Sequence, residues 1–465
     1  LGTLTALTVN GNVSVDGGTV KLDGNYPTGD NNVALGDSAL DSGSLSGANN
    51  VAIGFSALTS NTSGASNTVV GRSAMSTNTT GACNVAIGQN ALLQNTEGNT
   101  NVAVGRFALD NNTTADSNTA VGYESLGANT TGANNTAVGF DSLKANTTGC
   151  LNVAVGKSAL CTNTTGCTNT AIGRDAMLAN TTGDFNVAVG HEALDSNTTA
   201  NENTAIGAAS LAANTTGSQL TAIGKDSLKD NTTGYQNTAV GFQSSCSNTD
   251  GFNNVAMGPY ALRTNTTGDC NVAIGNEALT NSTTASTNTA VGSYALRANT
   301  TGSSNVSVGD SSLDANTTGT NNVSVGRSSM GTNTTGGDNT SIGQGVLFSN
   351  TTGSRNTAMG LSALDANTTA SDSTAVGSNS LGKVTTGPRN TAIGKDAGSN
   401  ITTGTDNVLA GKAAGNNITT GSRNMLFGTN TAASAADGTD NSVIGNSVTG
   451  KGNDTFTTGG ANGVF

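Results

Sequence analysis

The residues that could perform chemistry are few and scattered along this sequence. It contains one histidine, His191, so Ser–His triads, His-based acid–base pairs and histidine-cluster zinc sites lack their central component. Its six cysteines follow neither a metal-ligand spacing nor a disulfide framework. Cys150 and Cys167 share one repeat position in consecutive repeats, so we expect them to be neighbours. We predict free thiols, as in a reducing compartment.

Loops that bind phosphate or calcium are also missing from the pattern. Glycines recur throughout the chain but never in a GxxxxGK[ST] motif, and acidic residues do not occupy the fixed positions of a calcium-binding repeat. Carboxylates alone could support a glycosidase, which is the one enzymatic alternative left open. We predict that the chain is not an enzyme and that it holds no cofactor and no metal.

The charge balance limits the possible partners. Only 10% of the residues are charged, and the net charge is −12. Nucleic acids and anionic membranes both require clustered Lys and Arg, so both are disfavoured as partners. No stretch approaches the ~20 apolar residues of a membrane-spanning helix. We therefore predict no nucleic acid binding and no membrane insertion.

The elements that position these residues follow from a regular glycine series. Glycine recurs with a constant 17-residue period from Gly54 to Gly445, and Gly88, Gly122 and Gly156 are typical members of the series. A period of this length indicates a solenoid, in which each repeat forms one coil stacked on the last. Disorder is the alternative for a chain with 64 glycines and 3% aromatic residues, but a disordered chain has no reason to keep this phase.

The repeat spanning residues 118–134 shows the columns that each coil contributes. Val121 precedes the glycine and belongs to a Val/Ile column, while Leu126 follows it by four positions and belongs to a Leu/Met column. We predict two short strands, at 118–121 and 123–127, with Gly122 at the bend and both columns in the core. The fold class is therefore all-β, a repetitive parallel β-solenoid with 17-residue coils.

Two asparagine columns accompany the apolar ones. Asn118 opens the strand and Asn129 opens the following turn, and side chains stacked at such positions can form a hydrogen-bonded ladder. In two C-terminal coils the Leu column becomes Gly398 and Gly415. The turn asparagine becomes Ile401 and Ile418 in the same coils. This exchange of apolar volume predicts that the turn asparagine faces the core.

Burial within one chain falls short of what ordering each 17-residue coil costs, so we expect several copies to associate, with closed cyclic symmetry. We divide the chain into an N-terminal β segment at 1–32 that joins the fibre base, a β-roll repeat rod at 33–445, and a C-terminal segment at 446–465. The last is a cap or leads into a further domain.

The motif Asn84-Val-Ala-Ile-Gly88 resembles the Asn-Ser-Val-Ala-Ile-Gly motif of YadA-type trimeric adhesin heads. The longer unit, with its Ala-Leu and Asn-Thr-Thr-Gly runs, is similar to repeats of bacteriophage tail fibres, notably those of marine cyanophages. The N-terminal stretch at 7–24 is also similar to such fibres. The 17-residue period is longer than that of the adhesin heads. The resemblance covers residues 31–445 and implies a homotrimer of left-handed β-rolls.

The same resemblance implies an extracellular structural fibre of a phage tail or virion that helps attachment to a host. Its partners would be two further copies, other tail or baseplate proteins, and a surface glycan or protein receptor. A bacterial surface adhesin is the alternative, and an ice-binding β-solenoid is a third reading with less support, since adjacent threonines point to opposite faces. The receptor-binding residues are unknown. Aromatic residues near the glycine could stack on sugars or simply pack: Phe55, Tyr123, Phe140, Phe242, Tyr260 and Tyr294.

Overall fold

A computed structural model describes residues 30–459, and within this range it is all-β and contains no helix. The chain divides into two compact units, one ending at Asn169 and one beginning at Thr170. The first unit contains β1 to β8: Val33–Leu35, Val51–Ile53, Thr68–Val70, Val85–Ile87, Val102–Val104, Thr119–Val121, Thr136–Val138 and Val153–Val155.

The second unit contains β9 to β26, most of them again three residues long. These strands are Thr170–Ile172, Val187–Val189, Thr204–Ile206, Thr221–Ile223, Thr238–Val240, Val255–Met257, Val272–Ile274, Thr289–Val291, Val306–Val308, Val323–Val325, Thr340–Ile342, Thr357–Met359, Thr374–Val376, Thr391–Ile393, Val408–Ala410, Met425–Phe427, Ser442–Gly445 and Phe456–Gly459.

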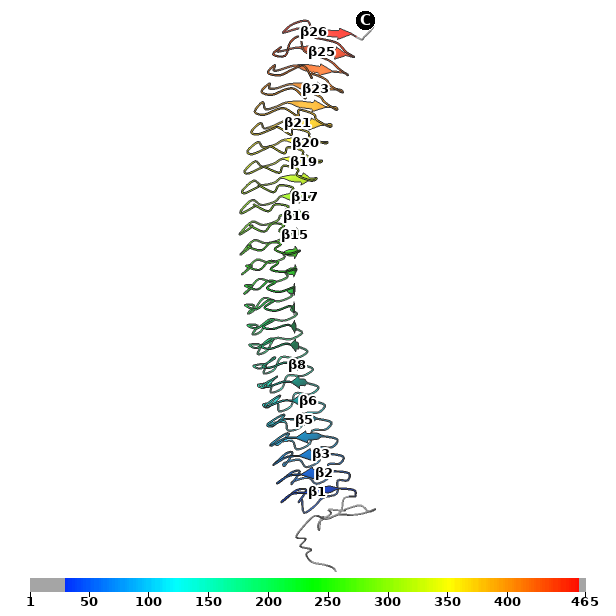
Figure 1. Cartoon of the computed structure of the whole chain (residues 1–465), viewed down its shortest axis with the longest axis vertical. Coiled ribbons are helices and arrows are strands. Elements are labelled where there is room, and N and C mark those ends of the chain that lie inside the picture. The colour runs from blue at the N-terminus through cyan, green and yellow to red at the C-terminus, as the bar shows by residue number, and fades with distance from the viewer. Residues whose placement is uncertain (1–29, 460–465) are drawn as a thin grey trace, which may run out of the picture. The chain divides into compact units, whose positions relative to one another are not determined.

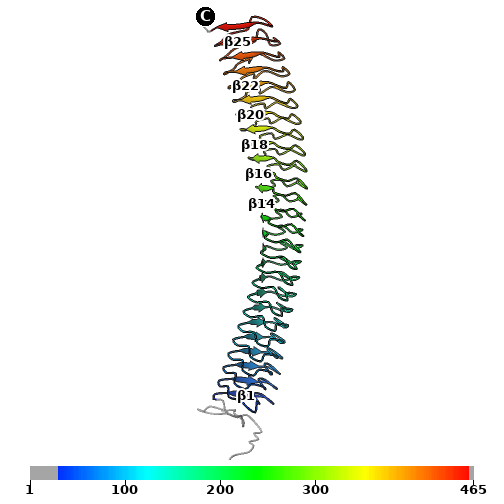
Figure 2. The ribbon, with the colours of Figure 1, turned by 180° about the vertical axis from the view of Figure 1, so that it is seen from behind.

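Within each unit the strands pair in chain order and in parallel (Figure 1). Each residue usually pairs with its equivalent in the next 17-residue repeat, as Val121 does with Val138. The β-solenoid with 17-residue coils is therefore confirmed. Figure 2, seen from behind, shows the strands of the second unit along one side of the stack of coils.

The terminal coils depart from this register. β1 pairs with β2 at an interval one position longer than usual, with Val33 beside Val51. β26 pairs with β25 at an interval three positions shorter than usual, with Ser442 beside Phe456, so the last described coil is shorter than the others. The predicted N-terminal β segment lies outside the described residues up to position 29, as do residues 460–465 of the C-terminal segment.

Of the two columns expected in the core, the Leu/Met column lies there and the Val/Ile column does not. Ala120, at the middle of β6, and Leu126 are both fully buried, whereas Val121 is only partly buried. Successive strand residues point to opposite faces, so a three-residue strand that buries its central side chain turns the first and third side chains outward. The prediction that the Val/Ile column lies in the core was wrong for this reason.

The second predicted strand, at 123–127, is also absent: these residues form a turn. Glu124 and Leu126 have φ angles of 50° and 52°, in the left-handed region, so the segment cannot be extended. The amide of Glu124 donates to the carbonyl of Arg106 at 3.1 Å, and that of Leu126 donates to the carbonyl of Ser142 at 3.0 Å. The turn therefore bonds to the preceding coil and to the following one, although it is not a strand.

The two asparagine columns form the expected ladders, and both are buried. Asn129 Nδ2 donates to Asn112 Oδ1 at 3.0 Å, and its own Oδ1 accepts from Asn146 Nδ2 at 2.8 Å. Asn118 Oδ1 accepts from the backbone amide of Asn135 at 2.9 Å, so this column caps the strand of the next coil. The prediction that the turn asparagine faces inward is confirmed.

The C-terminal coils show how little spare volume the core has. Ile401 and Ile418 are fully buried in place of the turn asparagine, as predicted. The central residue of the strand changes as well: in β23 it is Leu409, where most strands have alanine. A Cβ placed on Gly398 would lie 2.6 Å from Leu409 Cδ1, so the larger strand residue fills the space that the missing leucine leaves.

Candidate functional site

The seven repeat residues singled out from the sequence serve the architecture. Leu126, Asn118 and Asn129 lie in the core, and Val121 points outward. The glycines have φ angles of 133° at Gly88, 139° at Gly122 and 137° at Gly156, which L-residues rarely adopt. A Cβ on Gly88 would approach the carbonyl oxygen of Gly105 to 2.5 Å, so the coils meet here through bare backbone.

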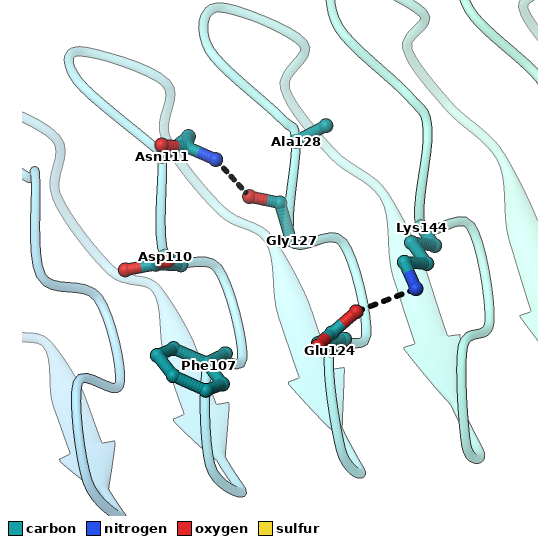
Figure 3. Close-up of a pocket in the computed structure, with 7 residues that line it drawn as sticks. All are labelled: Phe107, Asp110, Asn111, Glu124, Gly127, Ala128 and Lys144. Carbon is teal, nitrogen blue, oxygen red and sulfur yellow. Dashed lines mark hydrogen bonds and ion pairs between the residues drawn. The ribbon is translucent and has the colours of Figure 1, made fainter.

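A surface hollow lies on the turns of three consecutive coils in the first unit (Figure 3). It has a volume of about 360 Å³ and is lined by Phe107, Asp110, Asn111, Glu124, Gly127, Ala128 and Lys144. We call it the Phe107 hollow. Asp110, Gly127 and Lys144 occupy the same repeat position in successive coils. The hollow exists because the middle coil has no side chain there.

Hydrogen bonds and an ion pair fix the polar rim of the Phe107 hollow. Lys144 Nζ lies 2.5 Å from Glu124 Oε2, and Asn111 Nδ2 donates to the carbonyl of Gly127 at 2.8 Å. Figure 3 shows both interactions crossing from one coil to the next. The Lys144 ammonium, by its hydrogen bond, lowers the pKa of Glu124. Glu124 in turn raises the pKa of Lys144, so both groups are charged at neutral pH.

The carboxyl group of Asp110 has a raised pKa, whereas that of Glu124 has a lowered one. Burial, and secondarily the charge of Glu124, raise the pKa of Asp110 to about 6. Its Oδ1 atom is buried without a hydrogen-bond partner in the protein. The hollow thus holds one carboxyl that stays ionised and one that takes up a proton in mildly acidic solution.

This asymmetry predicts a pH-dependent effect of the substitution Asp110→Asn. Because the pKa is raised in the folded state, the stabilisation is complete below the usual value of 3.8 and is lost as the pH rises through about 6. An amide does not titrate, so Asp110→Asn should raise the melting temperature at about pH 7.5 but not at about pH 4. We expect about 1 kcal/mol, after allowance for the half-exposed position. Calorimetry at both pH values tests this.

The control for that experiment is Asp37→Asn, since Asp37 is exposed. An equal effect of both substitutions at both pH values would contradict the assignment. Asp195, Asp314 and Asp365 share the repeat position of Asp110, and burial is the first cause of a raised pKa in each. The same pH dependence should therefore appear, more weakly, when these residues are replaced.

Four of the six aromatic candidates from the sequence pack against another ring, whereas Phe55 is 51% exposed and Tyr294 lies against the guanidinium of Arg297. Tyr123 and Phe140 stack on each other with ring centroids 5.2 Å apart, and Phe107 meets Tyr123 edge-on at 6.3 Å. Phe242 and Tyr260 form another edge-on pair at 5.3 Å. Packing across coils is therefore established for these rings. Phe107 was not among the candidates. No signal in the sequence could have identified it, because glycine recurs in the column of Gly127, at Gly331 and Gly382.

Among the residues that the structure describes, one group of three side chains could supply metal ligands, and it contains His191. Ligand atoms of Asp175, His191 and Glu192 lie within 4.8 Å of one another. The Arg174 guanidinium contacts His191 Nε2 and lies 3.3 Å from Asp175 Oδ2 and 3.8 Å from Glu192 Oε1. A cation already sits among these groups, so the arrangement does not fit a metal ion.

Cys150 and Cys167 are neighbours, as expected from their shared repeat position. Their Sγ atoms are 2.9 Å apart, and the amide of Cys150 donates to Cys167 Sγ at 3.0 Å. The six cysteines are present as thiols.

Searches for relatives leave the family open. No model of a known protein family matches the chain, and no curated protein matches it either. Within residues 30–459 there is no helix long and apolar enough to cross a membrane.

Proposed function

We propose that this chain forms the repetitive shaft of a homotrimeric, left-handed β-roll fibre on a phage tail or another virion, extracellular and serving attachment to a host. Its partners would be two further copies, tail or baseplate proteins, and a surface receptor. One observation supports association most directly: the third residue of the strand, which lies on its outward face, is apolar in every coil from β1 to β25.

This face contains the first and third residue of each strand. No charged residue occupies either position in β1 to β26. Ile206 is 39% exposed, and Ile223, beside it in the next strand, is 38% exposed. Monomeric proteins rarely expose apolar patches larger than a few hundred Å². Such a face, repeated along each stack of coils, favours burial against identical faces of other copies.

The association can be tested by charging the face. Ile206→Lys combined with Ile223→Lys should leave the coils folded, because both side chains point away from the core. A buried unpaired ammonium costs several kcal/mol, so we expect at least a hundredfold weaker association. Light scattering should give about three times 45.5 kDa for the unaltered chain and lower masses for the variant.

The matched control places lysine on the turn instead, at the exposed Tyr235. Tyr235→Lys should leave the mass unchanged. An unaltered chain that stays monomeric at micromolar concentration would contradict the proposal, as would a double variant that keeps the full mass.

The same packing would serve a bacterial surface adhesin, which is the alternative. Antibodies against the chain distinguish the two: labelling of tails on purified virions supports the fibre, and labelling of bacterial surfaces supports the adhesin.

A further inference from the structure

The second unit contains a hollow at the same place in its coils as the Phe107 hollow. Its volume is about 610 Å³, and its lining includes Tyr260, Glu277, Thr280 and Arg297. We call it the Tyr260 hollow. Tyr260 occupies the same repeat position as Phe107, nine repeats further along the chain.

The two hollows present the same kinds of side chain at equivalent positions. An aromatic ring comes first, a glutamate follows at the same repeat position of the next coil, and a cation comes from the third coil. These residues are Phe107, Glu124 and Lys144 in one hollow, and Tyr260, Glu277 and Arg297 in the other. Each unit therefore contains one hollow in which three consecutive coils supply an aromatic ring, a glutamate and a basic residue.

Within the described residues, this repeat position carries an aromatic ring in three coils, at Phe107, Tyr260 and Tyr294. Its residues have left-handed backbone conformations in coil after coil, with φ of 60° at Phe107 and 59° at Tyr260. Such a conformation is disfavoured for bulky side chains, and the neighbouring coils carry Asn90 and Gln243 there instead. The guanidinium of Arg297, at the edge of the Tyr260 hollow, lies against Tyr294, so each described ring of this column lies in or beside one of the two hollows.

Neighbouring residues hold the cations at the edge of each hollow. Lys144 lies 3.4 Å from Asp141 Oδ1 in addition to its contact with Glu124. Arg297 Nε lies 3.0 Å from Asp314 Oδ1, and the guanidinium lies 4.9 Å from the ring centroid of Tyr294. Arg106 lies over the ring of Phe107 at 4.6 Å from its centroid, and Arg263 lies over the ring of Tyr260 at 5.5 Å, so donors are already placed at each ring.

These groups suit a sugar. The C–H face of a pyranose packs on an aromatic ring, while carboxylate, amide and ammonium groups bind its hydroxyls. The formal charges of the two hollows differ in sign, since one combines Asp110, Glu124 and Lys144 and the other combines Arg263, Glu277 and Arg297. A ligand common to both is therefore expected to be neutral.

We propose that the Phe107 and Tyr260 hollows are equivalent binding sites for a neutral saccharide. This inference rests on the proposed function, for which it names the class of receptor. No strand residue lines either hollow, so association of copies through the strand face would leave both hollows open.

The test uses the full chain and four neutral probes: maltotetraose, cellotetraose, mannotetraose and tetra-N-acetylchitotetraose. We expect saturation transfer to at least one of them and, by calorimetry, two sites per chain. The double variant Phe107→Ala/Tyr260→Ala should bind at least tenfold more weakly. Phe185→Ala, which removes an exposed ring outside both hollows, should bind normally.

A second variant fills one hollow without removing any contact group. Leu93 and Leu178 occupy the repeat position of Gly127 in other coils, so Gly127→Leu should fold, with a close contact of 3.2 Å between the added Cβ and the carbonyl oxygen of Glu124. It should reduce the stoichiometry from two sites to one. No binding of any probe, or binding that both variants leave unchanged, would overturn the inference.

Light scattering on the same samples separates this inference from the fibre. Normal assembly without saccharide binding would reject only the sugar sites. Saccharide binding by a chain that remains monomeric would reject only the trimer.

Discussion

Replacing Gly122 by valine should destabilise the first unit more than any other single change considered, by at least about 4 kcal/mol. The φ angle of 139° lies outside the range of L-residues, and an added Cβ would collide with the carbonyl group of Gly139, whose carbon atom lies at 2.7 Å. The backbone on the other side belongs to the next coil, so neither partner can move without opening the stack. Thermal unfolding followed by circular dichroism measures the effect.

The control for this change is Gly127→Ala, at a glycine of the same coil whose backbone conformation any residue can adopt. It should alter stability by less than about 1 kcal/mol. An unchanged melting temperature for Gly122→Val would contradict the close backbone contact between coils at the 17-residue glycine positions. Hydrogen exchange should show the lost protection centred on β6 and β7.

The second large effect is expected at the buried asparagine ladder. Asn129→Leu removes the donor to Asn112 Oδ1 and the acceptor of Asn146 Nδ2. Both groups are fully buried, and an unmet buried polar group costs ~1–3 kcal/mol, so the sum is roughly 3–4 kcal/mol. Thr131→Ala, on the exposed part of the same turn, should cost far less. Equal costs at the two positions would contradict the ladder as a source of stability.

The chain contains a natural break in this ladder that permits the reverse experiment. Ser282 occupies the asparagine position, and both its Oγ and the Oδ1 of Asn265 are buried without a partner within the protein. Ser282→Asn would offer Nδ2 to Asn265 and Oδ1 to Asn299, restoring the arrangement of neighbouring coils. It should therefore stabilise the second unit by roughly 1 kcal/mol. A destabilising result would show that the break relieves crowding.

Several features of the fold could be predicted from the amino-acid sequence. The constant interval between glycines implied parallel coils in a 17-residue register, because each coil must place equivalent residues side by side. The inward direction of Asn129 followed from the compensating changes at Ile401 and Ile418, since core volume is conserved between coils. These are periodic properties, which a repeat sequence displays many times over.

The tertiary structure decided which face of each strand is inside. Hydrophobicity favours burying Val121 over Ala120, yet the side chain that shares the core with Leu126 and Asn129 is the alanine. The turn at 123–127 likewise depends on tertiary contacts, because its left-handed residues bond alternately to the coil before and the coil after. A three-residue strand is too short for its own pattern to reveal these choices.

The hollows were beyond sequence reasoning for a related reason. The Phe107 hollow brings together side chains from three coils around the small Gly127, and none of its residues is unusual alone. The periodicity of the sequence determined that the chain stacks into coils, because most repeats place glycine, leucine and asparagine at equivalent positions. Only the tertiary structure decided what each surface offers, because a surface depends on the particular residues that stacking makes neighbours.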